Sequence, residues 1–359
     1  MKHFSGLSSA LAVSATVLLL AGCATAANSS AEPPAAGGSG DRYTQDDVTT
    51  ATGIHDVTSV FSVPKSLPED LNLAYINPSL GTPFFKSMSD GYKAAAEFYG
   101  VDIHEADLGN FNFADAVNKY DTISVFQPEV VGILTPSGAG LVDRTRADGV
   151  KLLASGIPIE GADGFIGTPE RETGMLAGSV LAEGVAPLVD DEWADQEVVF
   201  VGLGQAAIPT TMERVESGLE GFEAGGVEPD SAEFPDLGKS ATVADGVRVM
   251  ADFLTAHPEQ AIAVVAMNDQ AGVGALQAVQ AAGRQDDVRI VTIGADEVGR
   301  AAFKSDDGII LGEVDLNPWG AGWRWVEAAL ALALDEEFVI PAPERVITRD
   351  NVDELYPED

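Results

Sequence analysis

Amide, hydroxyl and carboxylate side chains follow several short apolar runs of the sequence, at Asn77, Thr135, Asp163, Gln205, Asn268, Asp269, Asp296 and Asp315. Such groups donate and accept hydrogen bonds in fixed directions, which is what ligand hydroxyl groups require. Two adjacent aromatic residues, Phe84 and Phe85, stand in the stretch NPSLGTPFFKSM at 77–88, between an apolar run and a helix-like run. Aromatic rings pack against the C–H faces of a sugar or polyol, so the two kinds of residue together predict a cleft for such a ligand.

Other chemistries lack the residues that they need. The sequence has neither an H-E-x-x-H nor a G-x-S-x-G motif, and no metal-ligand spacing joins its histidines, His3, His55, His104 and His257. The stretch VGLGQAAIP at 201–209 has G-x-G but no third glycine and no Lys-Ser/Thr, so it indicates a tight turn rather than a nucleotide site. We therefore expect no enzyme, no metal site and no cofactor.

Apolar runs of strand length alternate with alanine-rich amphipathic runs of helix length along most of the chain. The strand-like runs are 73–77, 101–106, 130–136, 157–163, 197–204, 261–269, 289–296 and 309–315, with a weaker one at 229–234. The helical runs include 113–126, 171–189, 243–257, 270–283 and 319–334. Continuous Val/Ile runs separated by helices predict βαβ units and a parallel sheet covered by helices on both faces.

The predicted fold class is α/β, with two doubly wound parallel-sheet lobes. A chain of 359 residues is long for a single core, and its strands fit two sheets better than one. Ligands of open α/β sheets bind beyond the carboxyl ends of the strands, which is where the polar residues named above stand.

The N-terminal stretch has the pattern of an export signal. Lys2 supplies a positive charge, Leu7 to Leu20 is apolar but short for a membrane span, and Leu20-Ala21-Gly22 precedes Cys23. Cys23 is the one cysteine of the sequence, and its position resembles the bacterial lipobox, in which the thiol is lipidated. We expect a signal peptide at 1–22 and a lipidated Cys23. An ordinary secretory signal with an incidental cysteine is the alternative.

Composition limits the partners of the chain. A formal net charge of -37 repels nucleic acid, so no nucleic-acid partner is expected. Residues 24–42 are mostly Ala, Ser, Gly and Pro and predict a flexible tether. The stretch 43–70 shows no clear pattern and is expected to be loosely packed. No later apolar stretch is long enough to span a membrane.

Several stretches, in their order and spacing, resemble the type I periplasmic binding proteins of ABC importers, the ribose- and galactose-binding group. NPSLGTPFFKSMSDGYKAAAEFYG resembles the first strand, loop and helix of that family, VVGILTPSG its third strand and GIPIEGAD its fourth. AMNDQAGVGALQAVQAAG, IVTIGADEVGRAAF and VITRDNV are similar to later stretches of the family. The resemblance covers about residues 71–352.

This resemblance implies two lobes joined by a hinge of three crossovers, near 165–170, 313–318 and 338–346. It divides the chain into 23–70 as lipidated N-terminus and tether, 71–165 plus 316–340 as N-terminal lobe, and 166–315 plus 341–359 as C-terminal lobe. A protein of this family binds a small solute between its lobes and delivers it to the transmembrane subunits of a permease. We expect a monomer that is lipid-anchored to the outer face of the cytoplasmic membrane.

Carried over residue by residue, the resemblance implies ligand contacts from Asn77, Phe84, Phe85, Asp163, Asn268 and Asp296. The sequence departs from the family where Gly164 follows Asp163 in place of an arginine. A second family arginine falls near Glu216, with Arg214 close by, and the family's hinge glutamine is replaced next to Asp315. We include Glu216 and Asp315 among the candidate contacts. The lost arginines argue against an ordinary aldopyranose and leave a cleft acidic enough to accept a neutral polyol or even a cationic ligand and to disfavour an anionic one.

Some of these residues also have purely structural interpretations. Either phenylalanine fits a hydrophobic staple at a helix start, Asn268 fits a helix N-cap and Asp296 fits a cap or turn brace. Trp319 and Trp323 share a helix face and are expected to pack into a core.

Four other functions are compatible with parts of the pattern. A receptor for a sensor kinase or a chemoreceptor would have the same sequence features, and an amino-acid- or nucleoside-binding protein would differ in its ligand alone. A repressor of the same fold needs an N-terminal helix-turn-helix, where this chain has an export signal. An exported enzyme needs a nucleophile and a base that the sequence does not display.

Overall fold

The structure is a computed structural model that describes residues 41–340 and 345–357. The expected signal peptide, Cys23 and nearly all of the expected tether lie outside the described residues. In the part that is described, no helix combines the length and the apolar character that a membrane span requires.

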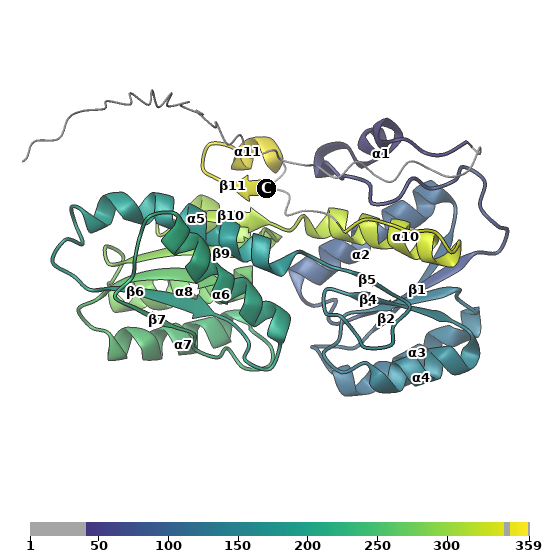
Figure 1. Cartoon of the computed structure of the whole chain (residues 1–359), viewed down its shortest axis with the longest axis horizontal. Helices are drawn as coiled ribbons and strands as arrows, with labels where there is room; N and C mark the ends of the chain where they lie inside the picture. Colours follow the sequence, from purple (N-terminus) through teal and green to yellow (C-terminus); the bar gives the residue numbers. More distant parts are fainter. Residues whose placement is uncertain (1–40, 341–344, 358–359) are drawn as a thin grey trace, which may run out of the picture. The chain divides into compact units, whose positions relative to one another are not determined.

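The first lobe is built on a five-stranded parallel sheet in the order β2-β1-β3-β4-β5 (Figure 1). Its strands are β1 Asn72–Asn77, β2 Asp102–Asp107, β3 Val130–Ile133, β4 Lys151–Ser155 and β5 Gly164–Ile166. Its helices are α2 Pro83–Tyr99, α3 Ala116–Ile123, α4 Ala139–Asp148 and α10 Pro318–Ala333, with 3-10 turns at η2 Phe113–Asp115 and η3 Ser124–Phe126.

The second lobe is built on a six-stranded sheet in the order β11-β10-β9-β8-β6-β7. Its strands are β6 Val198–Leu203, β7 Ser231–Glu233, β8 Ala261–Ala266, β9 Val288–Gly294, β10 Ile310–Asp315 and β11 Arg345–Ile347, the last of which is antiparallel. Its helices are α5 Glu170–Val189, α6 Pro209–Ala224, α7 Val243–Ala256, α8 Asp269–Ala282, α9 Glu297–Ser305 and α11 Val352–Leu355.

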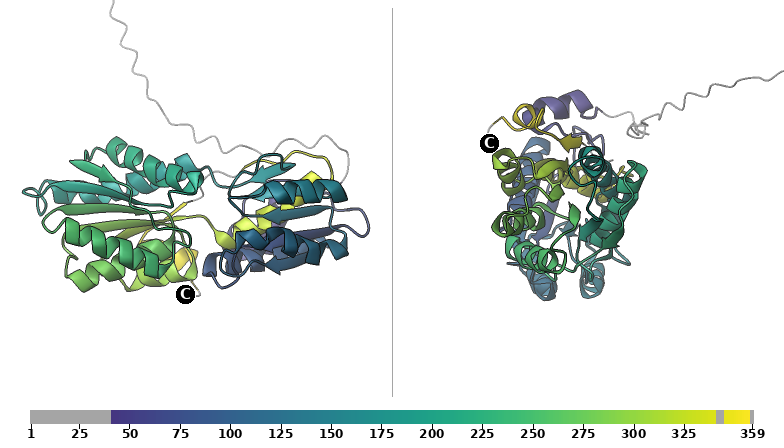
Figure 2. Two further views of the ribbon diagram at one scale, coloured as in Figure 1. Left: turned by 90° about the horizontal axis from the view of Figure 1, so that it is seen from below. Right: turned by 90° about the vertical axis from the view of Figure 1, so that its left-hand side faces the viewer.

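Each sheet has helices on both faces (Figure 2). Successive side chains of a strand point to opposite faces, and β1 shows the consequence. Leu73 and Tyr75 pack in the core under α2 and α10, whereas Ala74 and Ile76 pack under α3 and α4. A strand buried on both faces has no polar alternation, which is why continuous apolar runs predicted these sheets correctly.

Helix α10 comes late in the sequence but packs closely on α2 of the first lobe. A Cβ atom at Gly91 of α2 would overlap the carbonyl of Trp319, and one at Gly322 of α10 would overlap the carbonyl of Met88. The two glycines therefore set the close approach of the helices. Trp323 is buried on this side of the sheet and stacks with the half-buried Trp319, at a centroid distance of 5.6 Å. The expectation that both tryptophans pack in the core is confirmed.

The predicted fold of two parallel-sheet lobes is confirmed, but one predicted strand is wrong. Residues 157–163 form turns, and the fourth strand is β4 at Lys151–Ser155. The stretch IPIEGAD contains Pro158, which lacks an N–H group, and Gly161 at φ +83°, a left-handed backbone that no regular strand adopts. The chain passes between the sheets after β5, after β10 and between α10 and β11.

The segment 41–63 is packed on the first lobe, so the expectation that 43–70 is loosely packed and part of the tether is wrong. The helix α1 Gln45–Thr52 and the turn η1 Gly53–His55 lie in this segment. Val48, Val57, Val60, Phe61 and Val63 are all buried in the core that contains α2 and α10. The sequence pattern did not predict this packing, because the apolar residues of an irregular segment have neither helical nor strand spacing.

A buried carboxylate, Glu327 of α10, joins this segment to the first lobe. It accepts hydrogen bonds from the Ser59 hydroxyl at 2.9 Å and the Val60 amide at 2.7 Å. It also accepts from the Tyr99 hydroxyl at 2.7 Å and the Trp323 indole at 2.9 Å. Burial raises the pKa of Glu327, and these four donors oppose that shift.

We predict that Glu327→Ala destabilises the protein by on the order of 3 kcal/mol, because it leaves four buried donors without their acceptor. Urea unfolding of the two proteins measures the difference. The matched control is Glu337→Ala, an exposed glutamate on the chain beyond the same helix, which should change stability by less than about 0.5 kcal/mol. Equal unfolding midpoints for both variants would contradict the assignment of Glu327 as the joining group.

Candidate functional site

A cavity of about 830 Å³ opens at the carboxyl ends of strands from both sheets. The first lobe lines it with Ser79, which follows β1, and with Asp107 and Ser155, which end β2 and β4. The second lobe lines it after β6, β8 and β9, with Gln205, Asn268 and Asp296. The volume lies within the range of ligand-binding pockets, and its position is the one expected for open α/β sheets.

The two phenylalanines at the start of α2 line this cavity. Thr82 is the N-cap residue and Pro83 the first helical residue, which aims the next two side chains from the helix start. Phe85 is buried and Phe84 half-buried, with their ring centroids 5.4 Å apart in an edge-on arrangement. They form an apolar wall on the first-lobe side.

Asn77 ends β1 but is buried beneath the lining rather than part of it. Its Oδ1 accepts from the Ser79 amide at 3.0 Å, and its Nδ2 donates to the Phe85 carbonyl at 3.2 Å. Nδ2 also donates to Glu105 at 3.1 Å. The structure therefore gives Asn77 the role of fixing the loop that carries the phenylalanines.

The structure does not bring Asp163 or Glu216 to the cavity. Asp163 is exposed and accepts from the Leu152 amide at 2.8 Å, because the strand that it was expected to end lies earlier in the chain. Glu216 is exposed on α6, whereas Arg214 on the same helix is buried and lines the cavity. The expectation that both arginines are missing is corrected: Arg214 is present in the cleft.

Arg214 is held by an ion pair inside the cavity wall. Its Nε donates to Glu170 Oε2 at 2.5 Å, and its NH1 group donates to the Met267 carbonyl at 2.7 Å. Both charged side chains are about nine-tenths buried, with 11% and 8% of their surface exposed. A second guanidinium, Arg324 of α10, also lines the cavity, and burial lowers its pKa to about 10, so it is still charged at neutral pH.

Asn268 and Asp296 both line the cavity, and both also cap helices. The helix-cap interpretation is therefore correct for each, and it is compatible with a ligand contact. Asn268 Oδ1 accepts from the Ala271 amide at 2.9 Å at the start of α8. Asp296 Oδ1 accepts from the Val298 amide at 2.9 Å at the start of α9, and its Oδ2 accepts from Gln270 at 2.5 Å. The caps fix the positions of the polar groups that face the cavity.

A pair of buried carboxyl groups lies at this end of the second sheet. One oxygen of Asp269 and both oxygens of Glu313 have no hydrogen-bond partner among the residues that the structure describes. Burial, with the nearby charge of Glu313, raises the pKa of Asp269 well above its usual range. Burial raises the pKa of Glu313 to about 8, against the opposing charge of Arg300. In each of the two carboxyl groups, burial shifts the balance from the charged form toward the protonated form.

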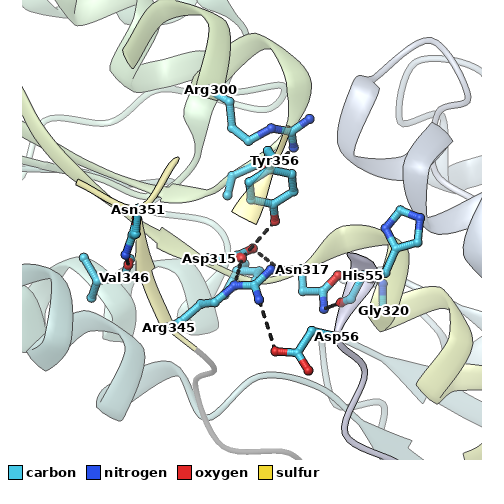
Figure 3. Close-up of polar contacts among 12 residues, drawn as sticks. His55, Asp56, Arg300, Asp315, Asn317, Gly320, Arg345, Val346, Asn351 and Tyr356 are labelled. Atoms are coloured by element: carbon cyan, nitrogen blue, oxygen red, sulfur yellow. Dashed lines mark hydrogen bonds and ion pairs between the residues drawn. The ribbon is translucent and has the colours of Figure 1, made fainter. Parts of the chain in front are cut away.

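Asp315, at the end of β10, forms the centre of the hinge (Figure 3). It lines the cavity and is fully buried. Its Oδ2 accepts from Arg345 Nε at 2.6 Å and from the Tyr356 hydroxyl at 2.8 Å, while Oδ1 accepts from the Asn317 amide at 2.6 Å. Through these three donors Asp315 connects the passage after β10, the passage before β11 and Tyr356 near the C-terminus.

The N-terminal segment reaches the same hinge. The His55 carbonyl accepts from Asn317 Nδ2 at 2.7 Å, and the His55 ring stacks on Trp319 at 3.9 Å (Figure 3 labels His55 and Asn317). Asp56 lies 3.4 Å from Arg345 NH1. Asp56 and Asn317 both have left-handed backbone, at φ +46° and +45°, a conformation that costs energy in residues other than glycine.

The sequence pattern missed several lining residues. Asn110, Phe111 and Phe113 follow β2, and Lys239 and Gln270 belong to the second lobe. The stretch GNFNF at 109–113 was a usable signal, because a glycine-asparagine pair beside aromatic residues follows a strand end there. Among the described residues, no group of three His, Cys, Asp or Glu side chains is placed to hold a metal ion.

We predict that Glu313→Gln stabilises the protein at high pH and not at low pH. A folded-state pKa raised above the unfolded value means that the folded chain holds a proton that the unfolded chain releases, so stability falls as the pH rises from about 4.5 to about 8. Glutamine removes this loss. The difference in Tm between variant and parent should therefore grow from pH 5 to pH 8.5.

Glu259→Gln, at an exposed position, is the control for this series and should give a flat difference. If the Tm difference for Glu313→Gln were also independent of pH, the buried pair would not hold the proton that we assign to it.

We predict that Arg345→Met and Asp56→Asn differ strongly, although they break the two ion pairs of the same guanidinium. Arg345→Met leaves the buried Asp315 carboxylate without its cation, at a cost of about 3–5 kcal/mol. Asp56 is 75% exposed, so its removal should cost less than about 1 kcal/mol. Urea unfolding measures both. Comparable losses would show that the exposed pair, not Asp315, carries the hinge contact.

The comparisons with known proteins agree with this architecture. Residues 73–337 match the family model described as periplasmic binding protein domain. The ribose import binding protein RbsB of Salmonella typhimurium is 25% identical over 260 residues, which cover 72% of this chain and 83% of that protein. A xylitol-binding protein of Mycolicibacterium smegmatis is 30% identical over 214 residues, 56% of each chain.

Solved structures share the fold. A solute-binding protein of an ABC transporter from Bacillus halodurans, with bound myo-inositol, superposes with a TM-score of 0.64 at 21% identity, over 81% of this chain and 98% of that one. The Caulobacter myo-inositol binding protein gives 0.65 at 19% identity, over 81% and 97%. The family model covers most of the sequence and both lobes of the cavity wall. This chain therefore belongs to the family of the periplasmic binding protein domain, whose members are solute-binding transport proteins and not enzymes.

Proposed function

We propose that this protein binds an uncharged polyhydroxy solute, a sugar or polyol, in the cavity and delivers it to the transmembrane subunits of an ABC permease. The observation that carries the proposal is the make-up of the cavity. The cavity is lined by aromatic rings from the first lobe and by amide, hydroxyl and carboxylate groups from the second lobe. Ring faces suit C–H surface, and directed polar groups suit hydroxyls.

Two of the charged groups in the cavity wall are already paired within the protein, which supports an uncharged ligand. Arg214 is neutralised by Glu170, and the Asp315 carboxylate is held by Arg345. A buried charge that already has its partner offers little to a ligand of opposite charge, because a second pairing would break the first. An amino acid or a nucleotide anion would have to bind charged lining residues outside these two pairs, which include Lys239 and Arg324. The two pairs therefore support a sugar or polyol, and the ligand screen tests the other charges.

The relatives support the same ligand class. The names of the related proteins include ribose, allose and xylitol as ligands, and the solved structures contain myo-inositol, glycerol and several sugars. All of these compounds are neutral and carry several hydroxyl groups. The candidate contacts that remain from the sequence are Phe84, Phe85, Asn268 and Asp296, with Asp315 as a hinge group.

Lipid anchoring and the division of the chain are also proposals. A lipid at Cys23 would hold the protein at the outer face of the cytoplasmic membrane as a monomer, with 24–40 as the tether. The N-terminal lobe would be 41–166 plus 316–340, and the C-terminal lobe 167–315 plus 341–359. The pairing of β5 with β4 and of β11 with β10 supports these limits.

The test is a thermal-shift screen of residues 24–359 against sugars, polyols, amino acids and nucleosides. A ligand present at about 100 times its Kd should add about 2.7 kcal/mol to the folded state, a clear rise in Tm. We predict a sugar or polyol hit whose Tm rise is lost in Phe84→Ala, because this substitution removes the half-buried ring from the wall.

Each variant is compared with its own ligand-free Tm, which separates binding from folding. Phe98→Ala is the matched control, since that half-buried ring packs on Tyr43 and lies outside the lining. A hit confined to amino acids or nucleosides would refute the sugar or polyol assignment while keeping a binding protein.

A further inference from the structure

The loop after β2 places two further aromatic rings on the cavity wall. Phe111 and Phe113 line the cavity beside Phe84 and Phe85, and both are only half-buried. Each packs at the edge of a core of the first lobe rather than inside it. The two rings extend the aromatic wall of the first lobe beyond the pair at the start of α2.

The backbone of the loop that carries Phe111 and Phe113 is strained. Gly109, Asn110 and Phe111 have φ values of +60°, +50° and +62°, so three consecutive residues are left-handed. This conformation is unfavourable for a large side chain such as phenylalanine. Glycine would adopt this conformation without strain, but the position holds Phe111. We take this as an indication that the ring has a function there.

Hydrogen bonds hold the loop against the phenylalanine-bearing loop of β1. The Phe111 amide donates to the Pro78 carbonyl at 3.0 Å, and the Leu108 amide donates to the Asn77 carbonyl at 2.8 Å. The Phe113 amide donates to the Phe111 carbonyl at 2.8 Å. The strain is therefore balanced by hydrogen bonds to a buried part of the lobe, which hold the loop backbone that carries the rings.

The four rings form one continuous row. The centroid distances are 5.4 Å from Phe84 to Phe85, 5.8 Å from Phe85 to Phe111 and 6.0 Å from Phe111 to Phe113, all edge-on. A monosaccharide ring is about as large as one aromatic ring, so a single sugar covers only part of this row. The cavity, at about 830 Å³, is near the upper end of the range for ligand pockets.

We propose that the ligand is a glycoside, a sugar unit joined to a second ring, and that Phe111 and Phe113 determine this specificity by packing against the second ring. The proposal rests on the proposed function, because it names the subclass of sugar that the same cavity takes. In this proposal the first ring lies near Asn268 and Asp296. The second ring lies along Phe111 and Phe113.

The competing role for the two rings is contact with the second lobe when the lobes close on a ligand. Ile208, Val243 and Val298 are apolar lining residues of that lobe. Such a contact would strengthen the binding of every ligand by the same factor. Packing against a second ring would strengthen only two-ring ligands, and this difference decides between the two roles.

The test is isothermal titration calorimetry of residues 24–359 with matched probes. The pairs are D-ribose, D-xylose, D-glucose and D-galactose, each with its phenyl β-glycoside, together with xylobiose, cellobiose and lactose. Xylitol and myo-inositol are single-unit probes. We expect at least one two-ring probe to bind tenfold or more tightly than its parent sugar, the gain that one aromatic contact gives.

The variants are Phe111→Ala and Phe113→Ala, and the control is Phe126→Ala, an exposed phenylalanine that stacks on His104 outside the cavity. We expect the first two to weaken the two-ring probe about tenfold and the parent sugar less than threefold. Phe113→Ala keeps the test valid if Phe111→Ala disturbs the strained loop. The control should leave both affinities unchanged.

The other outcomes overturn the proposal in distinguishable ways. A single-unit probe that binds as tightly as any two-ring probe refutes the glycoside but leaves the proposed function intact. An equal loss for both kinds of probe in the variants assigns the rings to lobe closure instead. Failure of all probes to bind a folded protein removes the proposed function and the glycoside together.

Discussion

The buried carboxylate of Asp315 is the contact on which the two-lobed arrangement depends. The chain crosses between the sheets at β10, and Asp315 ends that strand with its oxygens on Arg345 of β11, Tyr356 near the C-terminus and the Asn317 amide. A buried ion pair costs much to break. The passage is thus held at the end of β10 by Asp315, and at the start of α10 by the contacts of Asn317 and Trp319 with His55.

Helix capping and the shaping of the cavity use the same residues. A parallel sheet puts strand ends and helix starts at one edge, so a side chain that caps a helix there also borders the space above the sheet. Asn268 and Asp296 satisfy helix amides with one oxygen and are thereby held in one orientation. These two side chains are therefore held in place by the protein itself.

The periodicity of the sequence predicts the elements of both lobes, but it fails where the geometry depends on single residues. Buried parallel strands have continuous apolar runs, so both sheets and most strand ends were predicted. The strand before Asp163 was misplaced, because IPIEGAD has as many apolar residues as KLLAS but contains a left-handed glycine, Gly161. Glu216 was chosen over Arg214 because a shift of two residues on a helix moves a side chain to another face, which spacing alone does not resolve. Phe111 was missed because it stands in a loop after β2 and not at a strand end, although GNFNF at 109–113 was a usable signal.

The packing of 41–63 has a mechanical consequence. Arg42 binds the Ser62 carbonyl and Glu336, and the Tyr43 amide donates to the Val63 carbonyl, so the first described residues run antiparallel to 62–64. A pull that enters the chain at Asp41 is resisted in shear by this short ladder and by the buried side chains behind it. The load is spread over α10 instead of reaching β1 directly. If the protein is held by its N-terminus, as we propose, a pull on that end would load the segment 41–63 before it loads β1.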